Sequence, residues 1–245
     1  MKKTKPALIA LCGAICLALQ ISRAQVISPN PRFDIYAGGS FDYFRFSDTG
    51  GKVNGNAVGS PLFGFEADYE YTDYYSVGGG LMYKAYTQGV HIKGATFPNF
   101  EPVLQTLQIP VYLQIRSRGL KKVTAYAHVG GAVAFNLTYA DSPLVTGSNM
   151  QINGSNISET TRTDFGLKKV FPLIFIGGGI EAHIGWRSRL GISVRRYFGF
   201  TEIMKVDVNY RVDGGGPFLA QQKYKGHFLM LAIHFRHPFS WAYHL

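Results

Sequence analysis

Three histidines stand on segments of this sequence in which polar and apolar residues alternate. His128, His183 and His234 fall on the polar side of that alternation, and Glu181 precedes His183 by two residues. With Ser193 as nucleophile, a histidine base and an orienting acid could perform acyl transfer, provided that the groups meet near one rim. Two histidines and a carboxylate could also bind a metal ion, but they lack the compact spacing of metal ligands. We expect structural histidines and predict no catalytic, cofactor-binding or metal site.

Charged residues follow the same alternation and form a larger set. A strand turns successive side chains to opposite faces, so residues of one parity share a face. We expect these faces to line a barrel in which acids of the first two strands meet bases of later strands. Eight strands leave an interior just wide enough for side chains, which favours a plug of ion pairs; a narrow conducting path is the alternative. The predicted lumen charge network consists of Asp34, Asp42, Glu66, Asp68, Glu70, Lys84, Arg116, His128, Glu181, His183, Arg195 and Arg236.

Eight predicted strands position these residues. The most regular is Val123 to Tyr139, where every odd position across 17 residues is apolar or glycine. Strands in soluble domains are usually about 3–10 residues long, whereas a tilted strand needs about 9–11 to cross a bilayer and can continue into water. The other predicted strands are Arg32–Phe46, Pro61–Tyr71, Tyr75–Thr87, Val103–Arg116, Val170–Ile184, Arg189–Gly199 and Tyr224–Arg236. The pattern predicts an all-β fold, an eight-stranded antiparallel up-and-down transmembrane β-barrel over residues 32–236.

Long polar connections alternate with short turns along the chain. The long loops are predicted at residues 47–58, 88–101, 140–165 and 204–223. This alternation is typical of outer-membrane barrels, which have short periplasmic turns and longer outer loops. Met204 to Val212 in the last loop also alternates, but single-chain bacterial barrels have even strand counts. We therefore expect an extension of the seventh strand that turns at Asp213 to Gly216 and returns from Pro217.

A soluble barrel of the lipocalin type is the structural alternative. It would place the apolar faces inside and the charged faces in water. The apolar faces here carry almost no charge along the spanning length, and a charge facing lipid near the midplane costs about 2–4 kcal/mol. This distribution favours the membrane barrel. Within the fourth strand, Pro110 cannot donate a ladder hydrogen bond and is expected at a bulge or kink.

The chain begins with a predicted signal peptide over residues 1–24. Basic residues precede the apolar run Ala7 to Leu19, and small residues before Gln25 predict cleavage there; a membrane anchor helix is the alternative. Both cysteines, Cys12 and Cys16, fall inside this segment, so the mature chain has no disulfide, thiolate ligand or cysteine nucleophile. Four of the 25 Lys and Arg and none of the 15 Asp and Glu are removed with it, which leaves a net charge of +6.

Three segments resemble the small outer-membrane barrels common in Bacteroidetes, which include opacity-type, OmpA-like and PorT-like members. Leu107 to Leu113 resembles the family's L-x-I-P-L-x-L strand, and Phe175 to Glu181 its glycine-rich sixth strand. Arg196 to Ile203 is similar to its Y-x-x-G-L-x-(D/N)-I segment, with one residue fewer. The resemblance implies an eight-stranded barrel inserted into the outer membrane of a Gram-negative cell by the barrel assembly machinery. Such barrels often end on an aromatic residue, whereas this chain continues past Phe235 to Leu245.

These observations predict a monomeric, non-enzymatic outer-membrane protein with a side-chain-filled lumen and no cofactor. Residues 25–31 form a periplasmic lead and residues 237–245 a periplasmic tail. The expected role is structural, or binding and adhesion through the outer loops. An accessory role in protein secretion, as in PorT-like members, and a lipid-modifying barrel enzyme are the alternatives. Predicted partners are outer-membrane lipids, the assembly machinery, and an extracellular ligand or secretion-system protein; nucleic acid is excluded because the chain is exported.

Overall fold

The computed structural model describes most of the chain beyond residue 30. The described residues are 31–55, 58–72, 74–87, 90–93, 102–117, 122–138, 143–152, 154–165, 167–184 and 188–238. The predicted signal peptide, almost all of the predicted lead and the tail beyond residue 238 lie outside these ranges. Among the described residues, none belongs to a helix long and apolar enough to cross a membrane.

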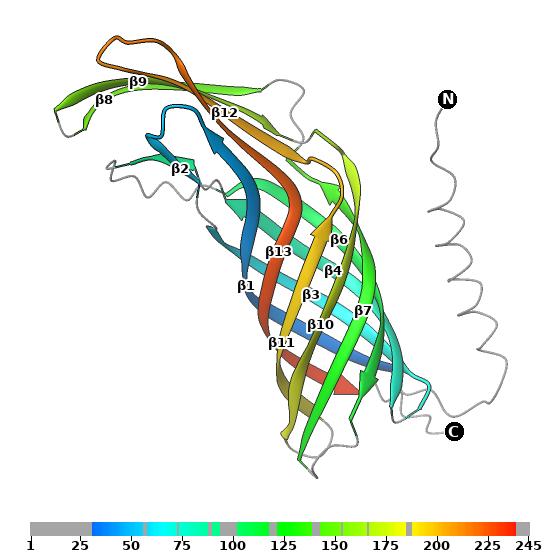
Figure 1. The fold of residues 1–245 in the computed structure, drawn as a ribbon. Helices are drawn as coiled ribbons and strands as arrows, with labels where there is room; N and C mark the ends of the chain where they lie inside the picture. The colour runs from blue at the N-terminus through cyan, green and yellow to red at the C-terminus, as the bar shows by residue number, and fades with distance from the viewer. Residues whose placement is uncertain are drawn as a thin grey trace, which may run out of the picture.

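Eight antiparallel strands close into a barrel (Figure 1). Each strand pairs with the next barrel strand in sequence, and the pairing of Arg32 with Pro238 through Asp48 with Ala220 joins the first strand to the last. The predicted eight-stranded antiparallel barrel is confirmed. The barrel strands are β1 (Pro31–Asp48), β3 (Val58–Glu70), β4 (Tyr75–Thr87), β6 (Pro102–Arg116), β7 (Val123–Asn136), β10 (Val170–Ile184), β11 (Ser188–Gly199) and β13 (Phe218–Pro238).

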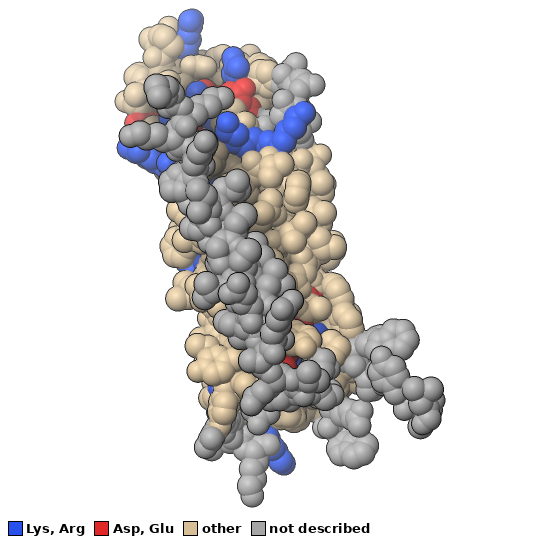
Figure 2. Space-filling model, turned by 90° about the vertical axis from the view of Figure 1, so that its right-hand side faces the viewer, with Lys and Arg blue, Asp and Glu red and all other residues tan. Residues whose placement is uncertain are grey.

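The barrel has an apolar outer surface and a charged interior. Neighbouring residues show the contrast, since Asp34 is 2% exposed and Ile35 is 62% exposed. On the outside, the Arg196 guanidinium lies 4.0 Å from the Tyr43 ring near one end of the barrel. Between Arg196 and the short turns, the described outward positions of the eight strands carry no Asp, Glu, Lys or Arg. Figure 2 shows one flank, where the middle is mostly uncharged and Lys and Arg gather mainly beside the long connections.

The two ends of the barrel differ, and we name them by their connections. The turn end carries the short turns and the first residues of β1. The loop end carries the long connections, as predicted by their alternation (Figure 1). At Pro110, the β4–β6 pairing is interrupted between Gly79 and Met82 and resumes in the same register. Of the two expected irregularities, a bulge is absent, because no extra residue enters either strand; the ladder is locally interrupted instead.

The sheet continues beyond the barrel because β13 changes its partner. β13 pairs with β11 inside the barrel and with β12 (Met204–Val212) beyond it. At this point Tyr43 of β1 faces His227 and Phe44 faces Tyr224, so β13 carries extra residues. Gly226 within this bulge has a φ of 84°, a conformation that glycine adopts without strain. Bulges bend strands, and Figure 1 shows β13 bending at the loop end.

Two further strands extend the sheet past β12. β9 (Ser155–Phe165) pairs with β12, and β8 (Leu144–Ile152) pairs with β9, in the order β13-β12-β9-β8. We call β8, β9, β12 and residues Phe218 to Tyr224 of β13 the outer platform. The predicted extension is present as the β12–β13 hairpin with its turn at Asp213 and Gly214. It does not continue β11 directly, because residues 200–203 separate β11 from β12.

Three regions predicted as loops contain strands. Residues 140–165 hold the β8–β9 hairpin, and the loops at 47–58 and 88–101 hold β2 (Val53–Gly55) and β5 (Val90–Ile92), which pair with each other. The prediction of plain loops was wrong there. The β8–β9 sequence is rich in Ser, Thr and Asn and has no continuous apolar face, so period-two hydrophobicity cannot reveal it. β9 is held in the sheet because its backbone pairs with that of β12.

One face of the outer platform is buried. Val206, Val208 and Tyr210 of β12 are at most 2% exposed and share an apolar cluster with Val53 and Ile92 of the small β2–β5 sheet. This packing fixes the platform over the loop end of the barrel.

Candidate functional site

The lumen contains equal numbers of acidic and basic side chains. Every one of them takes part in an ion pair within the described part of the chain. The acids are Asp34, Asp42, Glu66, Asp68, Glu70 and Glu181, and the bases are Arg32, Lys84, Arg116, Arg189, Arg195 and Arg236. The buried charge is therefore balanced, which a buried ionic network requires.

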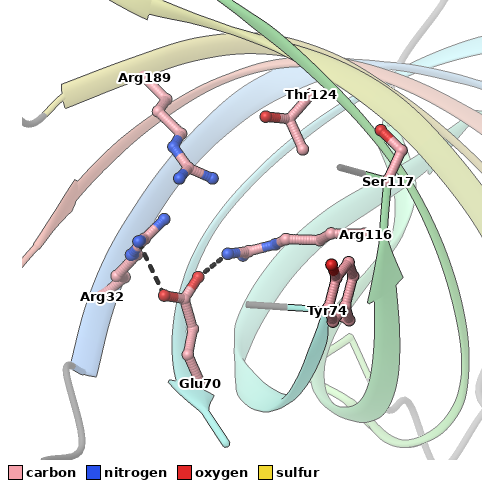
Figure 3. A pocket seen from close by; sticks show the side chains of 7 residues that line it. All are labelled: Arg32, Glu70, Tyr74, Arg116, Ser117, Thr124 and Arg189. Atoms are coloured by element: carbon pink, nitrogen blue, oxygen red, sulfur yellow. Dashed lines mark ion pairs between the residues drawn. The ribbon is translucent and has the colours of Figure 1, made fainter. Parts of the chain in front are cut away.

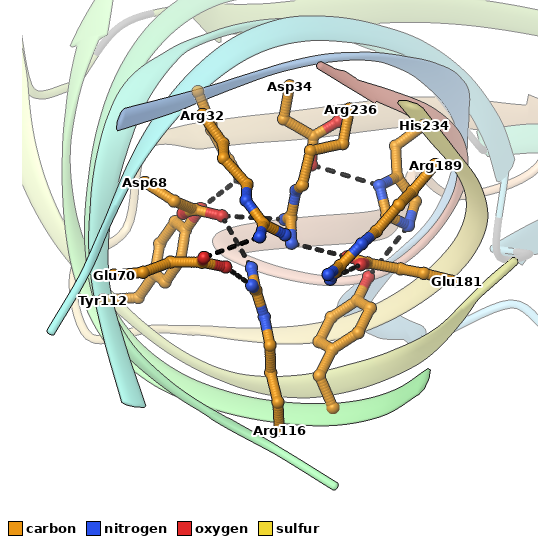
Figure 4. Close-up of polar contacts among 12 residues, drawn as sticks. Arg32, Asp34, Asp68, Glu70, Tyr112, Arg116, Glu181, Arg189, His234 and Arg236 are labelled. Carbon is orange, nitrogen blue, oxygen red and sulfur yellow. Dashed lines mark hydrogen bonds and ion pairs between the residues drawn. The ribbon is translucent and has the colours of Figure 1, made fainter. Parts of the chain in front are cut away.

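Arg236 of β13 is the centre of the larger cluster, near the turn end (Figure 4). Its Nη2 lies 2.9 Å from a carboxylate oxygen of Asp34 and 2.9 Å from one of Asp68. Its Nη1 lies 2.5 Å from Glu181. The three carboxylates come from β1, β3 and β10, so one guanidinium ties three parts of the wall together. Arg116 adds a contact of 3.3 Å to Asp68 and a second ion pair to Glu70.

A hydrogen-bonded chain runs beside this cluster. Nδ1 of His234 lies 3.1 Å from Asp34 (Figure 4). Nε2 of the same ring lies 3.2 Å from the Tyr126 hydroxyl. The carboxylate can only accept, so Nδ1–H donates to Asp34. The Tyr126 hydroxyl contacts the other ring nitrogen, so both nitrogens have a hydrogen-bonding partner, which suits a structural role in a filled lumen.

A second ionic level lies further toward the loop end. Arg195 pairs with Glu66 through both terminal nitrogens of its guanidinium group, Nη1 and Nη2. The Tyr112 hydroxyl donates to Glu66 over 2.9 Å. The Arg195 guanidinium also lies 5.4 Å from the Tyr112 ring and 5.7 Å from the Phe175 ring. This level combines a bidentate ion pair with cation–π contacts.

The third level adds an aromatic layer. Nζ of Lys84 lies 2.8 Å from Asp42 and 4.2 Å from the Tyr86 ring centroid. The Tyr197 ring stacks on Phe228 with centroids 4.3 Å apart. These residues are at most 1% exposed, as are Tyr224 and Met82. Ion pairs and stacked rings therefore fill successive sections of the lumen.

The structure places all but one of the predicted network residues inside the barrel. The exception is His183, which is exposed, because it pairs with Arg189 where β10 ends at the turn end. His128 is buried among Tyr112, Tyr126 and Phe175, and no described side chain forms an ion pair with it. It therefore belongs to the aromatic packing and not to the charge network.

The nucleophile and base considered in the sequence do not meet. Ser193 is buried opposite Gly179 of β10, whereas His183 lies four residues further along the same strand. Four strand residues span about 13 Å. The Tyr197 ring near the end of β11 also faces the lumen, where it stacks on Phe228. The described residues contain no group of three or more His, Cys, Asp or Glu arranged to hold a metal.

Two arginines of the lumen were missed in the sequence. Arg32 pairs with Glu70 over 2.7 Å, and Arg189 pairs with Glu181 over 3.1 Å. Strand parity would have found both, because Arg32 shares the parity of Asp34, and Arg189 that of Arg195.

A cavity of about 590 Å³ opens at the turn end and contains both arginines (Figure 3). Arg32, Glu70, Arg116 and Arg189 supply its charged lining. Tyr74, Ser117 and Thr124 supply hydroxyl groups. The cavity is of a size that small-molecule sites have, which is about 300–1,000 Å³.

The outer platform presents a polar face and a free edge at the loop end. Arg162 and Asp164 of β9 lie beside Lys205 and Asp207 of β12 in the strand register, and Gln221 donates to Asp207 over 2.8 Å. β8 forms the edge, and β9 is its one strand partner among the described residues. Side chains 144–149 of β8 are exposed on both faces.

Tyr210 anchors the buried face of the platform. Its hydroxyl donates to the Asp48 carboxylate over 2.8 Å and accepts from the Lys52 backbone N–H over 3.3 Å. Burial, reinforced by the hydrogen bond to Asp48, raises the pKa of Tyr210 to about 12. The neutral phenol therefore links β12 to the end of β1 at physiological pH.

The chain matches no protein-family model, and no curated protein sequence matches it. Among solved structures it is similar to the outer membrane protein OprG from Pseudomonas aeruginosa, with 10% identity over 84% of this chain and 95% of that chain and a TM-score of 0.39. It is also similar to Neisserial surface protein A, with 10% identity over 86% and 97% and a TM-score of 0.41. A major outer membrane protein from Thermus thermophilus shows 10% identity over 85% and 99% and a TM-score of 0.40.

Proposed function

We propose that this chain is a monomeric outer-membrane barrel with a closed lumen that binds a partner through its outer platform. The observation that carries the proposal is the contrast between the two regions. Packed ion pairs and aromatic rings fill the barrel, while the longest connections build an ordered sheet whose edge strand β8 has no second strand partner among the described residues.

The apolar band supports a position in lipid. Large apolar side chains such as Ile35, Phe63 and Ile233 are 62%, 57% and 61% exposed, and a water-soluble protein rarely exposes a continuous apolar surface of this kind. A closed barrel satisfies its backbone hydrogen bonds internally, which the hydrocarbon core requires. The short turns would then lie in the periplasm and the outer platform outside the cell.

Strand β8 supports a binding role. Natural edge strands are protected by short length, charged side chains, proline or bulges. β8 has nine residues, LVTGSNMQI, without charge or proline. Its backbone can therefore pair with an extended segment of another molecule, which is recognition by strand addition. The polar face of the neighbouring strand β9 can supply side-chain contacts.

Site-specific photocrosslinking in living cells tests this proposal. A photoreactive residue at Ser148 in β8 should give adducts, whereas the same residue at Asn209, exposed in the middle of the sheet, should give fewer. The variant Val145→Lys/Asn149→Lys places charges on the β8 edge and should abolish the Ser148 adducts. The barrel itself should still show the change of gel mobility on heating that is typical of a closed barrel (heat-modifiability). Equal adducts at both positions, or none at Ser148, would contradict the binding role.

Two further measurements separate the remaining alternatives. A planar-bilayer recording should show no steady conductance, and a steady conductance would contradict the closed lumen. Identification of the crosslinked partner as a secretion-system protein would assign the accessory role. The Ser193–His183 pairing considered for the lipid-modifying alternative has no support, because Ser193 lies opposite Gly179 and His183 lies four residues further along β10.

A further inference from the structure

The cavity at the turn end has an uneven charge distribution. Its lining contains the guanidinium groups of Arg32, Arg116 and Arg189 but a single carboxylate, Glu70. The compensating carboxylates, Asp68 and Glu181, lie deeper and are fully buried. The network is balanced as a whole, yet its outermost layer presents three positive groups for each negative one.

Two of these arginines have unused hydrogen-bonding capacity. Arg32 contacts Glu70 through Nη2, and its buried Nε has no hydrogen-bond partner among the described residues. Arg189 contacts Glu181 through Nη1, and within the described ranges no hydrogen bond of its other N–H groups is found. Figure 3 shows both guanidinium groups directed into the same space. Arg116, in contrast, already contacts both Glu70 and Asp68.

Strand order explains why these two arginines meet. They begin β1 and β11, which flank β13 at the turn end. Two guanidinium groups directed at one another repel unless an anion lies between them. The Ser117 hydroxyl adds a donor, because its oxygen accepts from the Ala125 N–H over 3.1 Å and its proton is free to point elsewhere. The Thr124 hydroxyl lines the same space.

We propose that this cavity binds a phosphate monoester, held between Arg32 and Arg189. Each guanidinium keeps N–H donors on its terminal nitrogens that can bond phosphate oxygens, and the planar guanidinium suits recognition of phosphate. The donors of two arginines and two hydroxyl groups exceed what the two oxygens of a carboxylate can use and suit the three terminal oxygens of a phosphate. The volume of about 590 Å³ leaves space for the organic part of the ester. That ester could be a soluble metabolite or the headgroup of phosphatidic acid, because both present a phosphate monoester.

Calorimetric titration of the full chain in a non-ionic detergent tests the site. Glycerol 3-phosphate should bind saturably, and Arg32→Gln and Arg189→Gln should each weaken binding at least tenfold. Arg189→Lys, which keeps the charge but loses the planar donor pair, should also weaken it. Arg162→Gln on the outer platform, where the side chain is 54% exposed, is the matched control and should bind like the unaltered protein. A gel-mobility assay of heat-modifiability verifies that each variant is a closed barrel.

A second titration with dihexanoyl phosphatidic acid identifies the source of the phosphate. Binding at least tenfold tighter than that of glycerol 3-phosphate would assign the site to lipid headgroups, and similar affinities would assign it to soluble esters. Absence of saturable binding for both compounds would overturn the proposal. So would equal weakening by Arg162→Gln and Arg189→Gln, because that result would indicate general charge attraction. None of these outcomes depends on whether the outer platform binds a partner.

Discussion

Arg195 of β11 and Glu66 of β3 form a bidentate ion pair across the lumen, with Nη2 of the arginine 2.7 Å from Oε2 of the carboxylate. The two residues are 129 positions apart in the sequence, and no ladder joins their strands. The pair therefore links two parts of the wall that backbone hydrogen bonding does not connect. This relationship makes the pair a sensitive probe of the filled lumen.

Loss of one partner should destabilise the barrel strongly. Arg195→Met leaves Glu66 as an uncompensated buried charge, which costs about 3–5 kcal/mol. Urea unfolding in detergent, followed by gel mobility, measures the loss. The double variant Glu66→Gln/Arg195→Met should lose much less. Lys223→Ala, which breaks an exposed pair with Glu202 at 4.0 Å, should cost about 0–1 kcal/mol. A similar cost for Arg195→Met and Lys223→Ala would show that the lumen is hydrated.

A charge on the outer surface of the barrel should be costly, and a charge on β8 should not. Val194 of β11 is 42% exposed on the apolar band, and Val145 of β8 is 58% exposed on the outer platform. Val194→Arg should lose about 2–4 kcal/mol if this position faces the bilayer midplane, while surface substitutions in water usually stay within about 0.5 kcal/mol. Unfolding from lipid vesicles compares the stability of Val194→Arg with that of Val145→Arg. Equal and small losses of stability would place the apolar outer surface of the barrel in water.

The pairing of β1 with β13, which closes the barrel, should not tolerate a methyl group at Gly38. A Cβ there would overlap the Leu231 carbonyl oxygen and lie 2.6 Å from Cα of Ala232, both on β13. At Gly39, the nearest heavy atom to such a Cβ is the Ser60 carbonyl oxygen at 3.9 Å. We expect Gly38→Ala to cost about 1–3 kcal/mol through overpacking and to reduce the yield of heat-modifiable barrel. Gly39→Ala should fold like the unaltered chain, and the reverse order would contradict the register of β1 and β13.

Tyr210→Phe should loosen the outer platform without opening the barrel. The hydrogen bond to the Asp48 carboxylate is lost, and bonds to charged groups contribute about 1.5–3 kcal/mol. Limited proteolysis should then cut β9 and β12 faster, while heat-modifiability stays unchanged. Tyr75→Phe is the control, since that side chain is 56% exposed.

The same residue predicts a pH dependence. The pKa of Tyr210 is raised to about 12 in the folded protein by burial and by the Asp48 hydrogen bond, against about 10 in an unfolded chain. Above pH 10 the unfolded state loses its phenol proton first, so the stabilisation is complete below pH 10 and declines between pH 10 and 12. Proteolysis of the platform with a protease active at alkaline pH should accelerate in that window. Tyr210→Phe should remove that part of the acceleration, and an unchanged profile would contradict the assignment.

The sequence by itself determined which residues share a face. Side chains alternate with a period of two along every strand, so Glu66 and Arg195 could be placed inside and Ile35 outside without any tertiary information. The same parity also gives Arg32, Arg189 and Tyr197 their inward direction. The number of barrel strands followed because each strand carries this signal within its own segment.

Only the tertiary structure decided which inward residues meet. The pairing of Glu66 with Arg195 and the convergence of three carboxylates on Arg236 depend on the stagger between strands that are distant in the sequence. No local pattern encodes that stagger. The distance of a residue from the end of the barrel also depends on this stagger. His183 therefore lies in solvent although it shares the parity of the buried Glu181. The β8–β9 hairpin was hidden because its strands bury little apolar surface and depend on the ladder that β12 supplies.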